Sequence, residues 1–136
     1  MANAGYSGTS LIIKLGIKPY MKVLLINEPK DYYKLLEMNI SKLICRKNEL
    51  PDIVHLFVKS NKEFVGEMKK LIAVIRKNSK IIIWVSWYKK AAKIQTDITE
   101  DVIRGYALKH NLVDVKVCAV SEIWSGLKLV VPLAKR

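Results

Sequence analysis

Residues 23–29 (VLLINEP) decide the fold of this chain. The first four form an unbroken apolar run, which is typical of a strand covered on both faces. Asn27 and Glu28 then make a polar turn, and Pro29 suits the first turn of a helix, where its missing N–H needs no partner. The stretch therefore predicts a buried strand that passes into a helix, the unit from which parallel α/β sheets are built.

The same alternation continues along the chain. Further apolar runs follow helical patterns, and the clearest helix begins at Ser60, whose spacing to Glu63 is that of a capping box. The expected strands are residues 22–27, 43–45, 53–58, 81–85, 113–118 and 127–131. We expect one Rossmann-like domain over residues 1–136, with an N-terminal arm and short helix at 1–15. It is a three-layer, doubly wound α/β fold whose mostly parallel sheet has about six strands and a C-terminal antiparallel pair.

The chain is strongly basic. It carries 24 lysines and arginines against 12 acidic residues, a formal net charge of +12. The excess is spread evenly over the sequence and is mostly lysine, which predicts a solvated surface, with nucleic-acid binding as the alternative. No apolar run is long enough for a membrane span, and the first ten residues lack the basic and apolar regions of a signal peptide. We therefore expect a cytoplasmic protein that does not bind membranes.

Metal and disulfide chemistry have little support in the sequence. His55 and His110 are far apart and no CxxC pair is present, so no zinc-ligand spacing exists. Cys45 and Cys118 each lie in an apolar segment and are expected to be buried free thiols. His55 lies inside an apolar strand and is expected to be a hydrogen-bonded core histidine.

The order of strands and helices resembles the class I methyltransferase fold, trimmed by one helix–strand unit. Residues 16–23 (GIKPYMKV) are similar to that family's approach to its first strand, and residues 52–56 (DIVHL) to the strand after its adenine region. The resemblance covers about residues 16–132 and implies S-adenosylmethionine as cofactor. However, Asn27-Glu28-Pro29 replaces the family's glycine-x-glycine loop, and Cys45-Arg46 replaces the acid that holds the ribose. We therefore predict no cofactor and keep S-adenosylmethionine as a disfavoured alternative.

Five segments carry a closer resemblance: residues 4–9 (AGYSGT), 84–87 (WVSW), 96–101 (TDITED), 115–120 (VKVCAV) and 124–128 (WSGLK). With these segments the chain resembles, over nearly its whole length, a small bacterial family known only as a domain of unknown function. The resemblance therefore implies no activity.

Candidate ligand-binding residues follow from topology, because doubly wound sheets bind ligands beyond the carboxyl ends of their strands. That rule selects Asn27 and Glu28 after the first strand, residues 59–60 after the third, and residues 86–90 after the fourth. In the last group, Ser86 ends the strand, Trp87 can stack on a planar ligand, and Lys89 and Lys90 can meet an anion. The alternative is that Trp87 packs in the core and the lysines lie in water.

Two further segments are candidates for the same edge of the sheet. Tyr6, Ser7 and Gly8 belong to a glycine pattern that leads into a helix, where it can hold a phosphate or lie across the sheet as a flexible arm. Trp124 can contribute to this edge or anchor a homodimer contact.

These observations favour a ligand- or partner-binding module on a methyltransferase-like scaffold that lacks the glycine-rich loop. Its partner is a small anionic or planar ligand, or another protein. Two alternatives stay open: a divergent S-adenosylmethionine-dependent methyltransferase, and a basic protein associated with nucleic acid. No catalytic residue is assigned.

Overall fold

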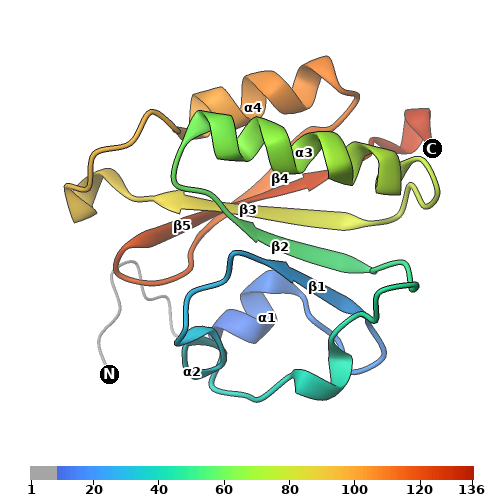
Figure 1. Ribbon diagram of the computed structural model, residues 1–136, viewed down its shortest axis with the longest axis horizontal. Coiled ribbons are helices and arrows are strands. Elements are labelled where there is room, and N and C mark those ends of the chain that lie inside the picture. The colour runs from blue at the N-terminus through green and yellow to red at the C-terminus, as the bar shows by residue number, and fades with distance from the viewer. Residues whose placement is uncertain (1–8) are drawn as a thin grey trace.

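The computed structural model describes residues 9–136, and one mixed sheet organises them (Figure 1). The strands are β1 (Val23–Ile26), β2 (Ile53–Phe57), β3 (Ile82–Tyr88), β4 (Val113–Ala119) and β5 (Trp124–Val130), in the spatial order β1-β2-β3-β5-β4. β1, β2 and β3 are parallel, whereas β5 is antiparallel to both of its neighbours. The predicted α/β class and the C-terminal antiparallel pair are confirmed, with the last strand inserted between β3 and β4.

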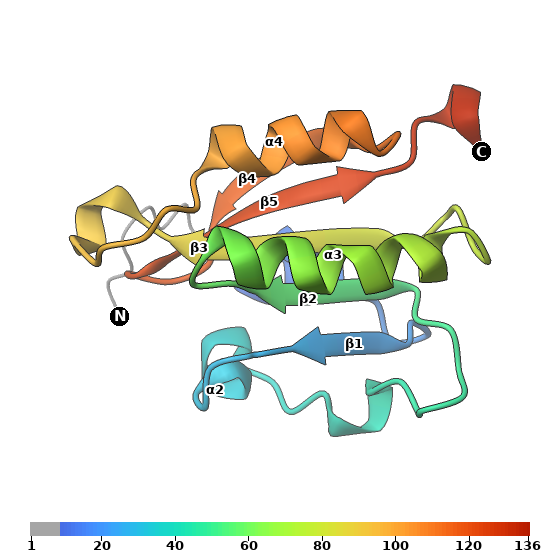
Figure 2. The same cartoon turned by 45° about the horizontal axis from the view of Figure 1, so that its top comes forward.

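Helices cover both faces of the sheet (Figures 1 and 2). α3 (Asn61–Ile75) and α4 (Glu100–Lys109) lie on one face, over an aliphatic core that includes Val54, Leu56 and Ile83. α1 (Leu11–Leu15) and α2 (Tyr32–Leu36) lie on the other, over an aromatic core that includes Phe57 and Trp84. The two cores account for the continuous apolar runs in β2 and β3, because both faces of these strands are buried.

The prediction of about six strands is wrong by one. Residues 41–43 form a 3-10 helix, and Ile44 makes only an isolated parallel bridge to Val23. The apolar run there is three residues long and lies between exposed Lys42 and Arg46, so it is too short and too charged to extend the sheet beyond β1. The start of the last strand also differs from the prediction, because β5 begins at Trp124, three residues earlier than expected.

After β1, the chain first passes along the outer side of that strand and then crosses to its inner side, where it forms β2. Val23 pairs with Ile44 on one side and with Ile53 on the other, so the chain leaves β1 outward and returns inward to β2. Open α/β sheets bind ligands beyond the carboxyl ends of their strands near such reversals. Asn27 stands at this point with φ of 59°, a left-handed conformation in which glycine and asparagine are favoured.

Polar side chains fix the starts of the two long helices. The predicted N-cap at Ser60 is present, because its Oγ accepts a hydrogen bond from the N–H of Glu63. Glu63 Oε1 accepts from the N–H of Lys59, one residue before the N-cap, at 2.8 Å, so the second half of the capping box is shifted by one residue. Asp97 Oδ1 accepts from the N–H of Asn61 at 2.8 Å and so caps α3 from a distant part of the chain. The N-cap of α4 is Thr99.

The sequence also led to expectations about the cysteines, metal binding and membrane spans. Cys45 and Cys118 are free thiols, both only partly buried. Within residues 9–136, no cluster of His, Cys, Asp and Glu side chains could hold a metal ion. No helix in this part of the chain is long and apolar enough to cross a membrane.

Candidate functional site

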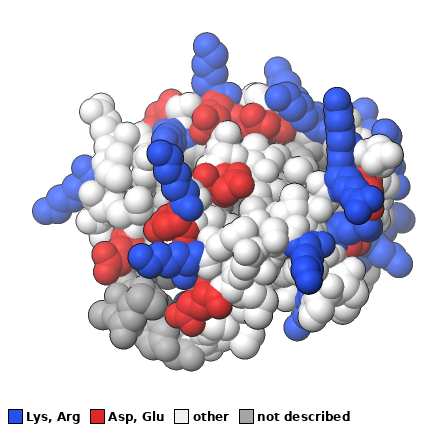
Figure 3. Space-filling model, turned by 60° about the horizontal axis from the view of Figure 1, so that its bottom comes forward, with Lys and Arg blue, Asp and Glu red and all other residues white. Residues whose placement is uncertain are grey.

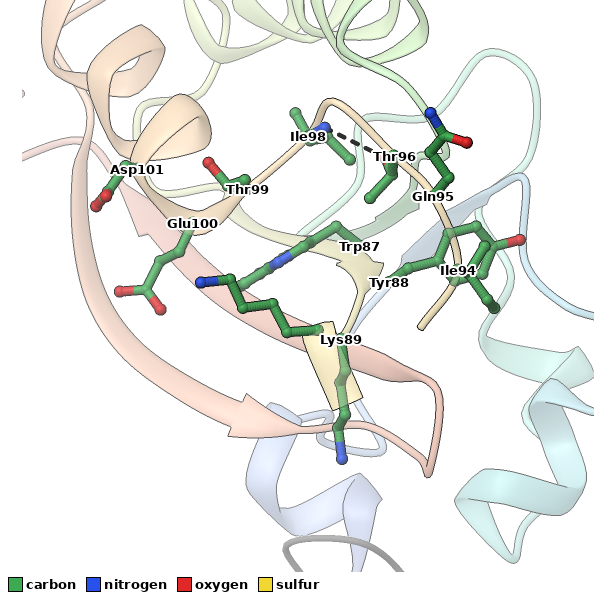
Figure 4. A pocket seen from close by; sticks show the side chains of 11 residues that line it. Trp87, Tyr88, Lys89, Ile94, Gln95, Thr96, Ile98, Thr99, Glu100 and Asp101 are labelled. Atoms are coloured by element: carbon green, nitrogen blue, oxygen red, sulfur yellow. Dashed lines mark hydrogen bonds between the residues drawn. The ribbon is translucent and has the colours of Figure 1, made fainter. Parts of the chain in front are cut away.

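A pocket of about 650 Å³ opens at the carboxyl end of β3 (Figure 4). Its volume lies within the range of small-molecule sites. It forms between the end of β3, the loop that follows η2 (Lys90–Ala92), and the first turn of α4. The lining residues are Trp87, Tyr88, Lys89, Lys90, Ile94, Gln95, Thr96, Ile98, Thr99, Glu100 and Asp101.

Trp87 gives the pocket an aromatic surface that belongs largely to the core. The side chain is only 7% exposed and packs in the same cluster as Ile98 of the loop and Ile103 of α4. Little of the indole is therefore left for a ligand. The predicted alternative, packing in the core, describes most of this side chain, while its remaining surface faces the pocket.

One arginine pairs with both acidic residues of the pocket wall. Arg104 Nη2 pairs with Glu100, its Nη1 lies 3.0 Å from Asp101 Oδ1, and its Nε lies 3.0 Å from Asp114 Oδ2. Hydrogen bonding to Glu100, first, and to Asp114 raises the pKa of Arg104, so the guanidinium stays charged. The guanidinium thus offsets part of the negative charge beside the pocket, and the positive charges of the pocket lining itself are lysines.

Two lysines supply that positive charge. Lys90 is exposed and makes no ion pair with any residue in the described range 9–136. Lys89 is partly buried and its backbone N–H donates to the Ile123 carbonyl at 2.9 Å. Burial and the neighbouring charge of Lys14 lower the pKa of Lys89, while the Glu122 charge raises it. Together they favour an anionic group on a ligand.

The loop that forms the pocket's rim is held in place by hydrogen bonds. Thr96 Oγ1 donates to the Lys59 carbonyl at 2.8 Å and accepts from the N–H of Ile98 at 3.2 Å. Asp97, the next residue, caps α3 as described above. Because these contacts tie the rim to the end of β2 and the start of α3, the pocket exists without a ligand to order it.

The structure brings together only some of the predicted site residues. Trp87, Lys89 and Lys90 share the pocket. Asn27 and Glu28 are exposed at the end of β1 and do not line it. Tyr6, Ser7 and Gly8 lie outside the described residues.

Two other predicted site residues lie on the opposite face of the sheet. Ser86 is fully buried. Trp124 is 5% exposed, stacks on Tyr88 with 4.4 Å between ring centroids, and meets the Phe57 ring edge-on at 5.0 Å. Both residues therefore serve the aromatic core, and neither lines the pocket.

The burial of Ser86 is explained by a chain of three polar side chains. Tyr32 Oη lies 2.7 Å from His55 Nδ1, and His55 Nε2 lies 2.7 Å from Ser86 Oγ. Burial lowers the pKa of His55 to about 3, so the imidazole is neutral at physiological pH. The prediction of a hydrogen-bonded core histidine is confirmed. These hydrogen bonds link α2 to β2 and β3, and the three side chains are buried from solvent.

Seven pocket residues lie beyond the predicted segment 86–90 and were not assigned to the site from the sequence: Ile94, Gln95, Thr96, Ile98, Thr99, Glu100 and Asp101. The types and positions of Thr99, Glu100 and Asp101 favour helix capping over a pocket wall, and Thr99 does cap α4. The available signal was topological, since residues between a parallel strand and the next helix lie at the carboxyl end of the sheet. The spacing of Arg104, four and three residues after Glu100 and Asp101, also predicts ion pairs on one helix face.

Comparisons with known proteins find a likeness in fold only. No protein-family model matches the chain, and no curated protein matches its sequence. A solved structure described as a protein in the NADB-Rossmann superfamily, from Streptococcus agalactiae, superposes with a TM-score of 0.49 at 7% identity. The superposition covers 92% of this chain and 69% of that one. The two resemblances in sequence therefore stay predictions, and no specific function comes from these comparisons.

Proposed function

We propose that the protein is a binding module for a small ligand that combines a planar or apolar part with an anionic group, seated in the pocket at the end of β3. The observation that carries this proposal is the charge arrangement around the pocket. Arg104 engages Glu100 and Asp101, while Lys89 and Lys90 line the opening. The remaining surface of Trp87 and the side chains of Ile94 and Ile98 form the apolar part.

The test compares a nucleotide with its uncharged nucleoside. Adenosine 5′-monophosphate has a planar base and a phosphate, whereas adenosine lacks the phosphate. At 100 times its dissociation constant a ligand stabilises the native state by about 2.7 kcal/mol, which for a chain of this size raises the unfolding midpoint on the order of 10 °C. We expect a rise with the nucleotide, and a smaller one with adenosine at the same concentration.

A pair of lysine variants locates the site. Lys90→Ala removes a charge from the pocket, and Lys69→Ala removes one from an exposed position on α3, away from it. The proposal requires Lys90→Ala to reduce the nucleotide-dependent shift and Lys69→Ala to preserve it. Equal shifts in the two variants, equal shifts with nucleotide and nucleoside, or no shift at millimolar nucleotide would overturn it.

One observation favours a divergent methyltransferase as the second candidate. Asn27 adopts φ of 59° directly after β1, so the backbone there already has a conformation that glycine usually supplies. The same thermal experiment with S-adenosylhomocysteine tests this candidate. A rise that is lost in Glu28→Gln would favour it over the pocket at β3, because Glu28 does not line that pocket.

A further inference from the structure

Eleven of the 24 lysines and arginines of this chain lie at the amino end of the sheet, opposite the candidate pocket. Parallel pairing places the starts of β1, β2 and β3 at one end, and antiparallel β5 finishes there. Exposed lysines and arginines flank these strands and the helices that precede them: Lys18, Lys22, Lys42, Arg46, Lys47, Arg76, Lys77, Lys80, Lys109, Lys135 and Arg136. Figure 3 shows basic side chains crowded at the right of the face that carries α1 and α2, with acidic side chains mainly to the left.

The acidic residues at this end are already engaged by the protein. Glu49 pairs with the Lys22 ammonium and accepts from the N–H of Arg46 at 2.9 Å. Asp52 Oδ2 accepts from the N–H of Lys22 at 2.7 Å, and Asp114 pairs with Arg104. The positive charge of the remaining side chains is therefore left to act on a partner.

Helix dipoles explain only part of this arrangement. Arg76, Lys77 and Lys109 lie at the carboxyl ends of α3 and α4, where cations are favourable in any protein. Lys42 lies in the three-residue 3-10 helix between α2 and β2, and Lys47 lies after it, so neither is at the end of a long helix.

A hollow of about 400 Å³ lies within this group of cations. It is lined by Pro19, Tyr20, Met21, Lys22, Lys42, Leu43, Ile44, Arg46 and Glu49. Tyr20 is 80% exposed and makes no ring contact with another aromatic residue of the described chain. An open aromatic face surrounded by cations is the combination that single-stranded nucleic acids bind, because bases stack and phosphates pair with the charges.

We propose that the basic end of the sheet binds single-stranded nucleic acid, with a base stacked on Tyr20 and the phosphates near Lys42, Arg46 and Lys47. A negatively charged membrane would also meet the lysines, but insertion needs a continuous apolar surface. The hollow instead holds Lys22, Arg46 and Glu49 beside Tyr20, which suits a polar chain.

Fluorescence anisotropy with a labelled oligouridylate of about 12 nucleotides tests the proposal, starting at about 50 mM salt. Lys42→Glu/Lys47→Glu reverses two charges at the basic end. Lys30→Glu/Lys62→Glu makes the same change in net charge at the opposite end, next to α2 and in α3, at exposed positions. We expect at least tenfold weaker binding in the first variant and near wild-type binding in the second. For the first variant, the slope of log K against log salt becomes shallower by about 1.4, since each lost phosphate contact accounts for about 0.7.

Tyr20 is tested separately. Tyr20→Ala removes the aromatic face and is expected to weaken binding about 5- to 150-fold, whereas Tyr20→Phe retains most of the affinity. No binding at about 50 mM salt, equal losses in the two charge variants, or binding only to phosphatidylserine vesicles would overturn the proposal. Unchanged affinity in Tyr20→Ala would overturn the assignment of the stacked base.

Discussion

The two ends of the sheet differ in how their aromatic and charged side chains are held. At the carboxyl end, Trp87 is 7% exposed and the acidic residues of the pocket are bound by Arg104. At the amino end, Tyr20 is 80% exposed, and Lys42 and Arg46 beside it make no ion pair with any residue of the described range 9–136. The first end is thus an extension of the core with a preformed hollow, and the second is a solvated surface. Truncation of the aromatic residue should therefore lower stability at the first end, and should change binding with little effect on stability at the second.

The largest effect is expected for Trp87→Ala. Truncating a large buried aromatic side chain removes its burial and leaves a cavity, so the free energy of unfolding should fall by about 3–5 kcal/mol. Urea denaturation measures this loss. A fall of less than about 1 kcal/mol would mean that Trp87 is a surface residue of the site, and would weaken the contrast between the two ends.

Acid should destabilise the protein through His55. Its pKa is about 3 in the folded protein and near 6.5 in the unfolded chain, so protonation favours unfolding. The stabilisation from this shift is fully present above pH 6.5 and is lost as the pH falls toward 3, by up to about 1.4 kcal/mol per pH unit. Denaturation between pH 7 and 5.5 checks it. A His55→Gln variant with the same pH dependence as the wild type would contradict this assignment.

Ser86→Ala tests whether that candidate residue serves the core or the site. The substitution leaves His55 Nε2 without its buried partner, which should cost about 1–3 kcal/mol of stability. Binding in the pocket should not change, because Ser86 does not line it. Chemical denaturation and the nucleotide titration together distinguish the roles: a loss of affinity without a loss of stability would assign Ser86 to a binding site.

The smallest effect on stability is expected for Tyr20→Ala. An exposed side chain with few contacts contributes little to folding, so the free energy of unfolding should stay within about 0.5 kcal/mol of the wild type. The same urea series measures it. A loss comparable to that of Trp87→Ala would show that Tyr20 is structural and would remove the contrast between the two aromatic residues.

Local patterns predicted the elements better than the sites. The apolar runs and the capping box at Ser60 gave the buried strands and α3, because both depend on residues close in sequence. The outer strand at 43–45 was predicted wrongly, because a three-residue apolar run does not show whether it will pair with β1 over several residues or by a single bridge. Ser86 and Trp124 were assigned to a site because the sequence does not show which face of a strand a side chain occupies once both faces are apolar.

The basic surface at the amino end of the sheet could not be predicted from the sequence, for a different reason. The basic excess is even along the chain, so no segment predicted a basic surface. Parallel topology then places the residues before β1, β2 and β3 at one end of the sheet, although they are far apart in sequence. The same topology places Lys90, Glu100 and Asp101 in one pocket, although the sequence around Glu100 and Asp101 favours helix capping.

The most direct test of two separate ends is amide NMR on one labelled sample, titrated first with adenosine 5′-monophosphate and then with the oligouridylate. The account predicts that the nucleotide shifts the amides of residues 87–101 and that the oligouridylate shifts those of residues 18–22 and 42–49. Shifts from both ligands at the same end of the sheet would contradict it.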